Sequence, residues 1–315
     1  MTEETPPLRE YVTAAETAAG ALDPPKLERL RRAFEADGVV VLCDVIPHPV
    51  LDHIATQLDF AAAHYVATDK GHERGAQGGF PRDGSRPGLQ ICSGIARQAP
   101  WVCPELVANP IIEQVAQAVL GLDSEIFIRY FNCNSSCPGS GAQMIHQDAG
   151  HAWQTEEAAA AAGEEFPHRA TRIFVNFGVD AMTPENGSTQ LWPGTHLLPQ
   201  TADPRWPEGG WYHEAELETQ RGTWQGNEFF DYPSFTTLVD EQRCRRPPVQ
   251  LSVPKGGVAI RDNRCWHAGR PNHTPWPRHM FGLGYMRYLV EGDPFAGDQN
   301  RCVAIQSSLR ATLCR

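Results

Sequence analysis

The sequence predicts an α+β protein with a mainly β core, and three features of the chain lead to this class. Apolar residues recur with a helical period in the N-terminal part. Short runs rich in β-branched and aromatic residues dominate the remainder, and turns rich in proline and glycine separate them. Helices followed by a succession of short strands indicate a β-sandwich or barrel with helices beside it.

Helical patterns are found in three segments. The first follows Asp23, which we expect to be its N-cap, and ends at Gly38. Segments 48–66 and 110–121 have the same period. Between the first two helices, the apolar run "VVVLCDVI" at 39–46 predicts a buried strand.

Later strands are predicted from β-branched and aromatic content. They cover residues 125–131, 171–180, 248–254, 257–262 and 281–290. Two other segments, 68–100 and 197–246, fit neither period, and long loops inside a compact domain are usually functional or disordered. The second segment is rich in tryptophan, whereas disordered segments are poor in aromatic residues. We therefore expect both to be substrate lids of a single domain spanning 1–315, with its core at about 30–290.

The composition argues against several classes of function. The chain has 315 residues, 41% of them hydrophobic and 21% charged, as in ordinary globular proteins. Its 27 basic and 38 acidic residues give a net charge of −11, which would repel nucleic acids and anionic membranes. No apolar run is long enough to span a bilayer. We therefore expect a small-molecule substrate as the partner, and find no sequence feature that indicates an oligomeric state.

The cysteines and the N-terminal residues indicate a reducing compartment. The nine cysteines form no C-x-x-C motif, and their number is odd. We interpret them as mostly buried thiols, with a disulfide network as the weaker alternative. The N-terminal "MTEETPPLRE" is acidic where a secretory signal would be basic and then apolar, so we expect a cytoplasmic protein.

The segment "MIHQDAG" at 144–150 places a histidine and a carboxylate two residues apart. On a strand, residues i and i+2 share a face, so His146 and Asp148 would project together while Gln147 points away. The two side chains would supply two ligands to a divalent metal. A salt-linked surface pair is the competing interpretation of this motif when it is taken alone.

The best candidate for a third ligand is His267, in "IRDNRCWHAGRPNH" after a predicted strand. Two histidines and one carboxylate form the facial triad of non-haem Fe(II) oxygenases, which leaves positions open for cosubstrate and dioxygen. Zinc is less favoured, because structural zinc takes four ligands and catalytic zinc sites usually show other spacings.

A cation for a cosubstrate is also present in the sequence. A bidentate α-keto acid would fill two of the open metal positions, and its distal carboxylate would need a fixed positive charge. Arg278 lies eleven residues after His267, at the start of the next strand. Its planar guanidinium pairs well with a carboxylate. An exposed arginine after a proline-rich turn is the equally weighted alternative.

Three longer motifs occur in order, "PGSGAQMIHQD", "PENGSTQLWPGTH" and "GGVAIRDNRCWHAGRPN", and an arginine follows the third. Together they resemble the phytanoyl-CoA dioxygenase family of Fe(II)- and 2-oxoglutarate-dependent oxygenases. The resemblance covers roughly residues 30–290, with specific motifs in 138–148, 185–196 and 256–288. It implies a double-stranded β-helix, which is a jelly-roll or cupin-like barrel, with flanking N-terminal helices.

The resemblance also implies roles for individual residues. The Fe(II) ligands that it implies are His146, Asp148 and His267. The residues that it implies for 2-oxoglutarate are Arg278, which would pair with the distal carboxylate, together with Gln143, Thr189 and Asn176. Gly187 and Gly194 are expected to permit positive φ in turns, and His196 to be a hydrogen-bonded scaffold residue.

We therefore expect an Fe(II)- and 2-oxoglutarate-dependent dioxygenase that uses O2 and releases succinate and CO2. It would hydroxylate, desaturate or rearrange a small, fairly apolar natural product. The tryptophan-rich segment 197–246 and the match of "PGSGAQ" to biosynthetic members of the family motivate this substrate class. Asp148 argues against halogenation, because related halogenases have a small residue there and chloride takes its place at the metal.

Other functions stay open from the sequence. An acyl-CoA hydroxylase of the phytanoyl-CoA type is one, for which Arg74, Arg82 and Arg86 could meet the phosphates of coenzyme A. The segment after Asp148 and the long insertion 197–246 depart from the family pattern, which argues against copying the acyl-CoA substrate. A non-catalytic metal-binding barrel, a metal-dependent hydrolase and a cupin-like isomerase would use the same ligands.

Overall fold

The computed structural model describes the helices and strands around the predicted site, while several connecting segments lie outside its described part. The described residues are 7–68, 90–93, 103–121, 126–138, 140, 147–148, 156–163, 165–166, 169–198, 246–287 and 303–304. Most of the predicted lid segments, and the motif residues Gln143 and His146, therefore lie outside it.

Helices are concentrated in the first part of the chain, as predicted. They are α1 (Ala14–Ala19), α2 (Pro24–Asp37), α3 (His48–Thr68), α5 (Pro104–Val107), α6 (Pro110–Leu120), α7 (Glu156–Ala161) and the 3-10 helix η1 (Thr195–Leu197). The strands are β1 (Arg9–Tyr11), β2 (Val39–Cys43), β3 (Gln90–Ser93), β4 (Phe127–Ser136), β5 (Arg172–Gly178), β6 (Thr189–Leu191), β7 (Val249–Gln250), β8 (Val258–Asp262), β9 (His267–Gly269), β10 (Arg278–Met286) and β11 (Val303–Ala304).

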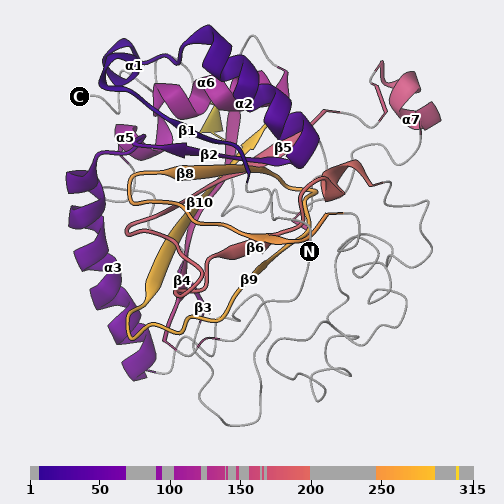
Figure 1. Cartoon of the computed structure of the whole chain (residues 1–315). Coiled ribbons are helices and arrows are strands. Elements are labelled where there is room, and N and C mark those ends of the chain that lie inside the picture. Colours follow the sequence, from indigo (N-terminus) through magenta and orange to yellow (C-terminus); the bar gives the residue numbers. More distant parts are fainter. Residues whose placement is uncertain are drawn as a thin grey trace, which may run out of the picture.

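The described strands form two sheets, so the predicted α+β class with mainly β structure is confirmed. The larger sheet has eight strands in the order β1-β2-β8-β5-β10-β4-β11, with β3 paired to β4. The smaller sheet has the order β7-β6-β9. Helices α1, α2 and α6 cover one side of the larger sheet, and the smaller sheet lies on its other side (Figure 1).

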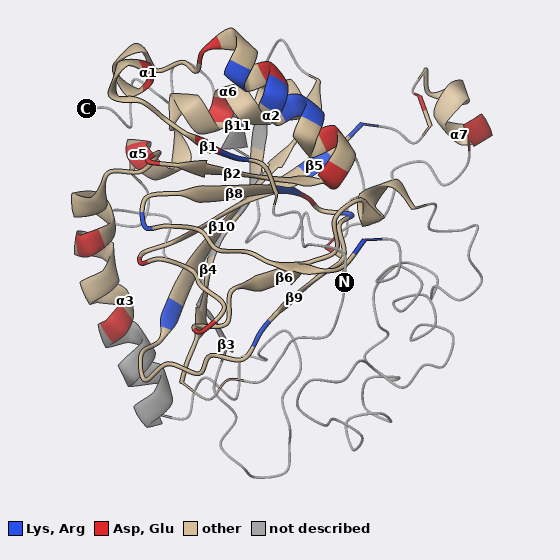
Figure 2. Cartoon of the chain, in the orientation of Figure 1, with Lys and Arg blue, Asp and Glu red and all other residues tan. Residues whose placement is uncertain are grey.

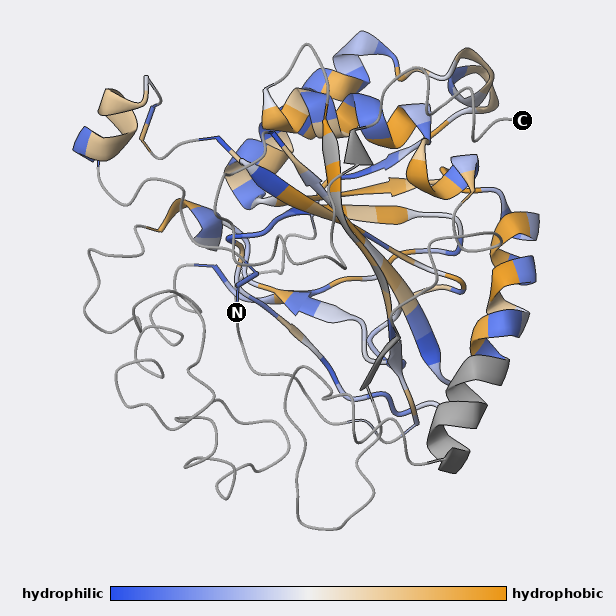
Figure 3. Ribbon diagram, turned by 180° about the vertical axis from the view of Figure 1, so that it is seen from behind, coloured by the Kyte–Doolittle hydropathy of each residue, from blue (hydrophilic) through white to orange (hydrophobic). Residues whose placement is uncertain are grey.

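Both faces of the larger sheet are buried, and strand β2 shows how the sequence achieves this. Val40 and Leu42 belong to the apolar cluster shared with the helices. Val39 and Val41 belong to a second cluster, which includes Leu191 of the smaller sheet. Successive strand residues point to opposite faces, so a strand buried on both sides is continuously apolar. The apolar colouring of the central strands is visible in Figure 3.

The helical layer carries the charge instead. Charged side chains are numerous on α2, whereas most of the sheet residues are uncharged (Figure 2). On α2, Arg31 pairs with Glu28 at 2.8 Å and also with Glu35, at spacings of three and four residues. Such pairs lie on the solvent side of a helix and add little stability individually.

Strand β10 helps to position the site, because its side chains point alternately to the helical layer and to the space between the two sheets. Phe281, Leu283 and Tyr285 belong to the cluster shared with the helices, and the ring of Phe281 stacks on Phe177 with centroids 5.1 Å apart. Met280 instead packs against the cluster between the sheets. Arg278 shares the face of Met280, so the first residue of β10 projects between the sheets.

Three local predictions need correction. α2 begins after Asp23 as predicted, but the Asp23 side chain forms no capping hydrogen bond, and Pro25 at the second helical position lacks one of the N–H groups that such a side chain normally binds. The region 68–100 is not entirely loop, since Gln90–Ser93 forms β3 by pairing with β4. The strand predicted over 125–131 continues to Ser136 as β4. In the last two cases pairing between distant segments overrides weak local preference.

Two further predictions, on the glycine conformations and on the cysteines, are confirmed within the described residues. Gly38, Gly187 and Gly194 have φ of 75°, 76° and 81°. Five cysteines whose side chains the structure describes carry free thiols, namely Cys43, Cys103, Cys133, Cys137 and Cys265. Among the described helices, none is both long enough and apolar enough to cross a membrane.

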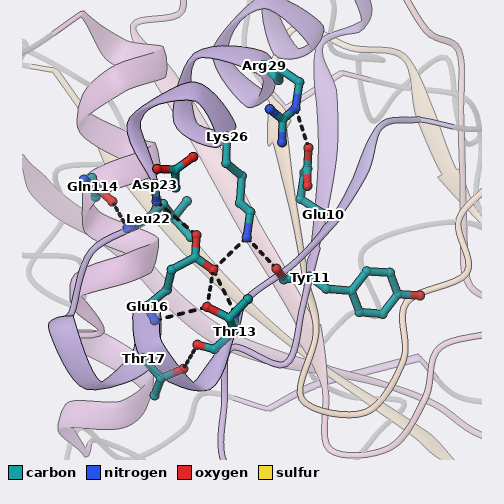
Figure 4. Close-up of polar contacts among 10 residues, drawn as sticks. All are labelled: Glu10, Tyr11, Thr13, Glu16, Thr17, Leu22, Asp23, Lys26, Arg29 and Gln114. Atoms are coloured by element: carbon teal, nitrogen blue, oxygen red, sulfur yellow. Dashed lines mark hydrogen bonds and ion pairs between the residues drawn. The ribbon is translucent and has the colours of Figure 1, made fainter.

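The N-terminal segment is attached to the helical layer by a network around one carboxylate (Figure 4). Glu16 accepts hydrogen bonds from the backbone and hydroxyl of Thr13 at 2.8 and 2.9 Å. It also accepts from the backbone of Asp23 at 3.0 Å and from Nζ of Lys26 at 2.6 Å. The Asp23 N–H and the Lys26 ammonium, with Thr13, lower the pKa of Glu16 to about 2.

Candidate metal and cosubstrate site

His267 is the first residue of strand β9 in the smaller sheet. Pairing of His267 with Leu191 of β6 fixes its backbone, and its side chain is buried. Nδ1 lies 3.0 Å from the carbonyl oxygen of Cys265, which can only accept a hydrogen bond. We therefore assign the proton to Nδ1, which leaves the lone pair on Nε2. A second-sphere bond of this kind is typical of a metal-binding histidine.

Asp148 faces that lone pair. Its Oδ2 lies 3.3 Å from Nε2 of His267. A carboxylate oxygen and an unprotonated imidazole nitrogen are both acceptors, so they repel each other unless a cation or a proton lies between them. Two neighbouring ligands each about 2.1 Å from one metal ion at a right angle would lie about 3 Å apart. The donor set and its spacing therefore fit a divalent metal.

The prediction that the His-x-Asp motif lies on a strand is wrong at its described end. Asp148 lies in a bend, and its backbone N–H donates to the carbonyl of Asn263 at 2.8 Å. Gln147 is buried. The bend is attached to the turn between β8 and β9, so Asp148 and His267 are brought together by a contact between two loops. His146 lies outside the described residues, and its place in the site stays a prediction.

Arg278 lies between the sheets, as the sequence predicts for a cosubstrate cation. Only 6% of its surface is exposed. Its Nε donates to the carbonyl of Asn186 at 3.2 Å, and its Nη1 lies 3.3 Å from the sulfur of Met280. Within the described residues no carboxylate pairs with it. Burial lowers the pKa of Arg278 to about 10, and a bound anion would relieve that cost.

Thr189 lies beside Arg278. Its hydroxyl is 3.9 Å from the Met280 sulfur, which Arg278 also contacts. Thr189 pairs with Gly269 of β9, two residues after His267. The hydroxyl and the guanidinium therefore border the same part of the inter-sheet space, as expected of two groups that share one carboxylate. Gln143 lies outside the described residues.

Asn176 is buried on β5, and its contacts differ from those expected of a residue that only lines the cosubstrate. Its Oδ1 accepts from Nε of Arg261 at 3.1 Å, and its Nδ2 donates to the carbonyl of Phe281 at 3.4 Å. Arg261 in turn donates from Nη2 to Asp148. Asn176 is thus linked to Asp148 through an arginine that the sequence analysis did not single out.

The signal for Arg261 is present in the sequence. "GVAIRD" is a buried strand, and an arginine in such a run is unusual because a buried charge needs a partner. The next two charged residues of the chain, Asp262 and Arg264, instead form an ion pair with each other. Asp262 accepts from Nε and Nη2 of Arg264 at 2.9 and 2.7 Å. Burial opposes the charge on Asp262, but Arg264 holds its pKa below the usual range.

His196 has the structural role expected of it. Its Nε2 lies 3.1 Å from the carbonyl oxygen of Glu35 at the end of α2, and burial lowers its pKa. Gly38 ends the same helix with φ of 75°. A Cβ on Gly38 would lie 2.2 Å from the sulfur of Cys265 and 2.6 Å from Nδ1 of His196. The turn therefore requires glycine, and the helix end packs directly behind the strand that carries His267.

Comparison with known proteins identifies a family and its fold. The model of the phytanoyl-CoA dioxygenase (PhyH) family matches residues 34–280. The structure of AviO1 from Streptomyces viridochromogenes Tue57 is 19% identical, with a TM-score of 0.53 over 90% of this chain and 100% of that chain. The epimerase SnoN, in complex with Fe3+, alpha ketoglutarate and nogalamycin RO, is 19% identical, with a TM-score of 0.52 over 88% of this chain and 91% of that one.

A third solved structure is the alpha ketoglutarate dependent carbocyclase SnoK from nogalamycin biosynthesis. It is 16% identical, with a TM-score of 0.53 over 88% of this chain and 96% of that one. At such low identities the likeness shows a shared fold. The fold extends over most of each of the three chains.

Proposed function

This chain belongs to the phytanoyl-CoA dioxygenase family of iron- and 2-oxoglutarate-dependent enzymes, and from that premise we propose that it oxidises a small, fairly apolar natural product. The observation that carries the proposal is the approach of two acceptors, Asp148 Oδ2 and His267 Nε2, to 3.3 Å in the same inter-sheet space as a buried arginine.

Each group in the site has a part in the proposal. Fe(II) is held by His146, Asp148 and His267, and the distal carboxylate of 2-oxoglutarate by Arg278 and Thr189. Gln143 and Asn176 lie further along the same cosubstrate. Iron and 2-oxoglutarate, when bound, supply dioxygen activation coupled to decarboxylation of the keto acid. We further propose that the two sheets form the double-stranded β-helix of the family and that 1–315 is one domain.

The reaction follows from the oxidant. One oxygen atom of O2 enters succinate as CO2 leaves, and the other is available for the substrate. Hydroxylation places it on a carbon of the substrate, whereas desaturation releases it as water after two hydrogens are removed. Asp148 supports both over halogenation, because its carboxylate occupies the position that chloride would need. The inter-sheet residues contribute a buried setting, which keeps water from the reacting atoms.

The substrate class is supported by the relatives as well as by the sequence. SnoN binds nogalamycin RO and SnoK acts in nogalamycin biosynthesis, so this fold serves natural-product chemistry in both. In this chain the tryptophan-rich segment 197–246 and residues 68–100 are proposed to be the lids over the substrate. We also propose a cytoplasmic location, in keeping with the free thiols among the described cysteines.

Anaerobic addition of Fe(II) and 2-oxoglutarate tests the site. A weak visible charge-transfer band is expected, and it should disappear in His267→Ala. On admission of air, succinate formation should increase with candidate polyketide or terpenoid substrates, and mass spectrometry should find products heavier by one oxygen or lighter by two hydrogens. Tightly coupled turnover of acyl-CoA thioesters would overturn the substrate class. Absence of the band would overturn the proposed function itself.

A further inference from the structure

Arg261 is buried directly behind the two described metal ligands, and the facial triad does not account for it. It lies on β8, six residues before His267, and only 5% of its surface is exposed. Its Nη2 donates to Oδ2 of Asp148, the oxygen that faces His267. A fully buried guanidinium on a metal-facing carboxylate calls for an explanation, because replacing such a pair by apolar residues is often neutral for stability.

The direction of approach shows that Arg261 supports the ligands without taking the place of the metal. Its Nη1 lies 3.4 Å from Nδ1 of His267, whereas Asp148 lies nearest Nε2. Nδ1 donates to the carbonyl of Cys265 at 3.0 Å, so the longer approach of Nη1 is a contact and not a hydrogen bond. The guanidinium thus contacts the imidazole at its Nδ1 atom, and the Nε2 lone pair can still share an ion with Asp148.

The larger sheet fixes the guanidinium in this orientation. Phe174 and Asn176 of β5 pair with Arg261 and Ala259 of β8, so both lie beside the arginine on one face. The guanidinium carbon lies 5.0 Å from the centre of the Phe174 ring. Nε donates to Oδ1 of Asn176 at 3.1 Å, and the bond from Asn176 Nδ2 to the Phe281 carbonyl sets the orientation of the amide.

Asp148 needs such support because its own backbone is irregular. It lies in a bend, and the bend is joined to the β8–β9 turn by the hydrogen bond to Asn263. A side chain in a bend has no strand register to set its direction. Its direction is instead set by a rigid fork, which a flexible lysine could not reproduce.

We infer that Arg261 is a positioning residue that holds the Asp148 carboxylate in its metal-binding orientation through a chain of contacts from β10 by way of Asn176. This inference rests on the proposed function, since it presupposes that Asp148 is a ligand. Outer-sphere partners of this kind typically contribute about 10- to 100-fold to metal affinity. Arg261 would act through Asp148 and is not itself catalytic.

Titration of the apoprotein with Co(II), followed by calorimetry and visible absorption, tests the inference. Arg261→Lys retains the charge and loses the fork, so it should bind Co(II) about 10- to 100-fold more weakly than wild type. Arg261→Gln removes a positive charge beside the metal. If Arg261 acted only through its charge, this variant would bind more tightly, whereas loss of positioning makes it bind more weakly.

Two further variants keep the test decisive. Phe174→Leu keeps Arg261 and removes the ring beneath it, so we expect a loss of about threefold, and this variant decides the question if the arginine variants fail to fold. Arg29→Lys is the matched control, because Arg29 pairs with Glu10 at 2.9 Å in the outer layer, and it should leave Co(II) affinity unchanged (Figure 4).

The outcomes separate the inference from the proposed function. Folded Arg261→Lys that binds Co(II) within threefold of wild type would overturn the role of Arg261. So would a lowered melting temperature with unchanged Co(II) affinity, since that is the result of a structural role alone. If wild type binds no Co(II), or if His267→Ala binds it equally well, the proposed metal site fails instead.

Discussion

Two carboxylates in this molecule meet positively charged side chains, and their surroundings differ in kind. Glu16, at the N-terminus of α1, accepts four hydrogen bonds from Thr13, Asp23 and Lys26. Asp148 also accepts from a cation, Arg261, but its Oδ2 additionally faces an imidazole nitrogen at 3.3 Å. All the groups around Glu16 are donors, whereas those around Asp148 include a second acceptor.

The difference is the one we expect between a purely structural site and the proposed metal site. Around Glu16 the chain itself supplies every donor, so the network contributes stability as soon as the protein folds. Around Asp148 we propose that the two facing acceptors gain stability when a metal ion binds between them. Removing the Glu16 carboxylate should therefore lower the stability of the protein and leave turnover unchanged. Removing the Asp148 carboxylate should chiefly lower turnover.

The largest expected effect is on turnover. Asp148→Ala removes a proposed metal ligand, so succinate formation should fall by more than the roughly 100-fold typical of outer-sphere changes. Coupled succinate assays with saturating Fe(II) and 2-oxoglutarate measure it. Full succinate production by the folded variant would contradict the assignment of Asp148 as a ligand, and circular dichroism provides the control for folding.

The next effect concerns the cosubstrate. Arg278→Lys keeps a charge and loses the planar fork, so the concentration of 2-oxoglutarate needed for half-saturation should rise about 10- to 100-fold. Titration of the Co(II)-loaded protein with 2-oxoglutarate measures it. Affinity for Co(II) alone should stay the same, and a parallel loss of Co(II) binding would show that Arg278 acts on the metal site instead.

Glu16→Gln should lower the free energy of unfolding by about 2 kcal/mol at pH 7, because it weakens charge-assisted hydrogen bonds. The pKa of Glu16 is lowered from 4.5 to about 2 in the folded protein, so its stabilisation is present above pH 4.5 and is lost as the pH falls towards 2. Urea unfolding of both proteins at pH 7 and pH 3 measures the difference. A difference independent of pH would show that the charge is not its cause, and turnover should not change.

The smallest effect is expected at Thr189. Thr189→Val preserves the shape of the side chain and removes the hydroxyl, so the requirement for 2-oxoglutarate should rise about fivefold, for one hydrogen bond worth about 1 kcal/mol. The same titration measures it. An unchanged requirement would remove Thr189 from the cosubstrate site and leave Arg278 as the proposed anion contact.

Much of the fold and part of the site could be predicted because the signals are local. The helices α2 and α6 end at Gly38 and Gly121, as predicted, and both glycines adopt the left-handed αL backbone conformation. His267 was recognised because it follows a predicted strand, and Arg278 because it begins the next strand after a turn rich in proline. The family resemblance is confirmed by the match over residues 34–280.

Other features could not be predicted, because they depend on contacts between distant residues. Arg261 donates hydrogen bonds to Asp148 and Asn176, which lie 113 and 85 residues away from it in the sequence. Strand β3 exists because four residues with modest β preference pair with β4. The backbone of Asp148 is hydrogen-bonded to Asn263 in the β8–β9 turn and lies in a bend. A strand-like alternation of residue types does not predict this contact.

The amino-acid sequence alone determined which residue types are available and where the chain turns, because helix period, strand alternation and turn residues act over a few positions. It therefore determined the longer helices and most of the longer strands, in their order, and the candidate ligands and cosubstrate cation. Only the tertiary structure decided that Oδ2 of Asp148 lies 3.3 Å from Nε2 of His267 and that Arg261 lies behind them. Those distances arise from packing two sheets together, which no short stretch of sequence specifies.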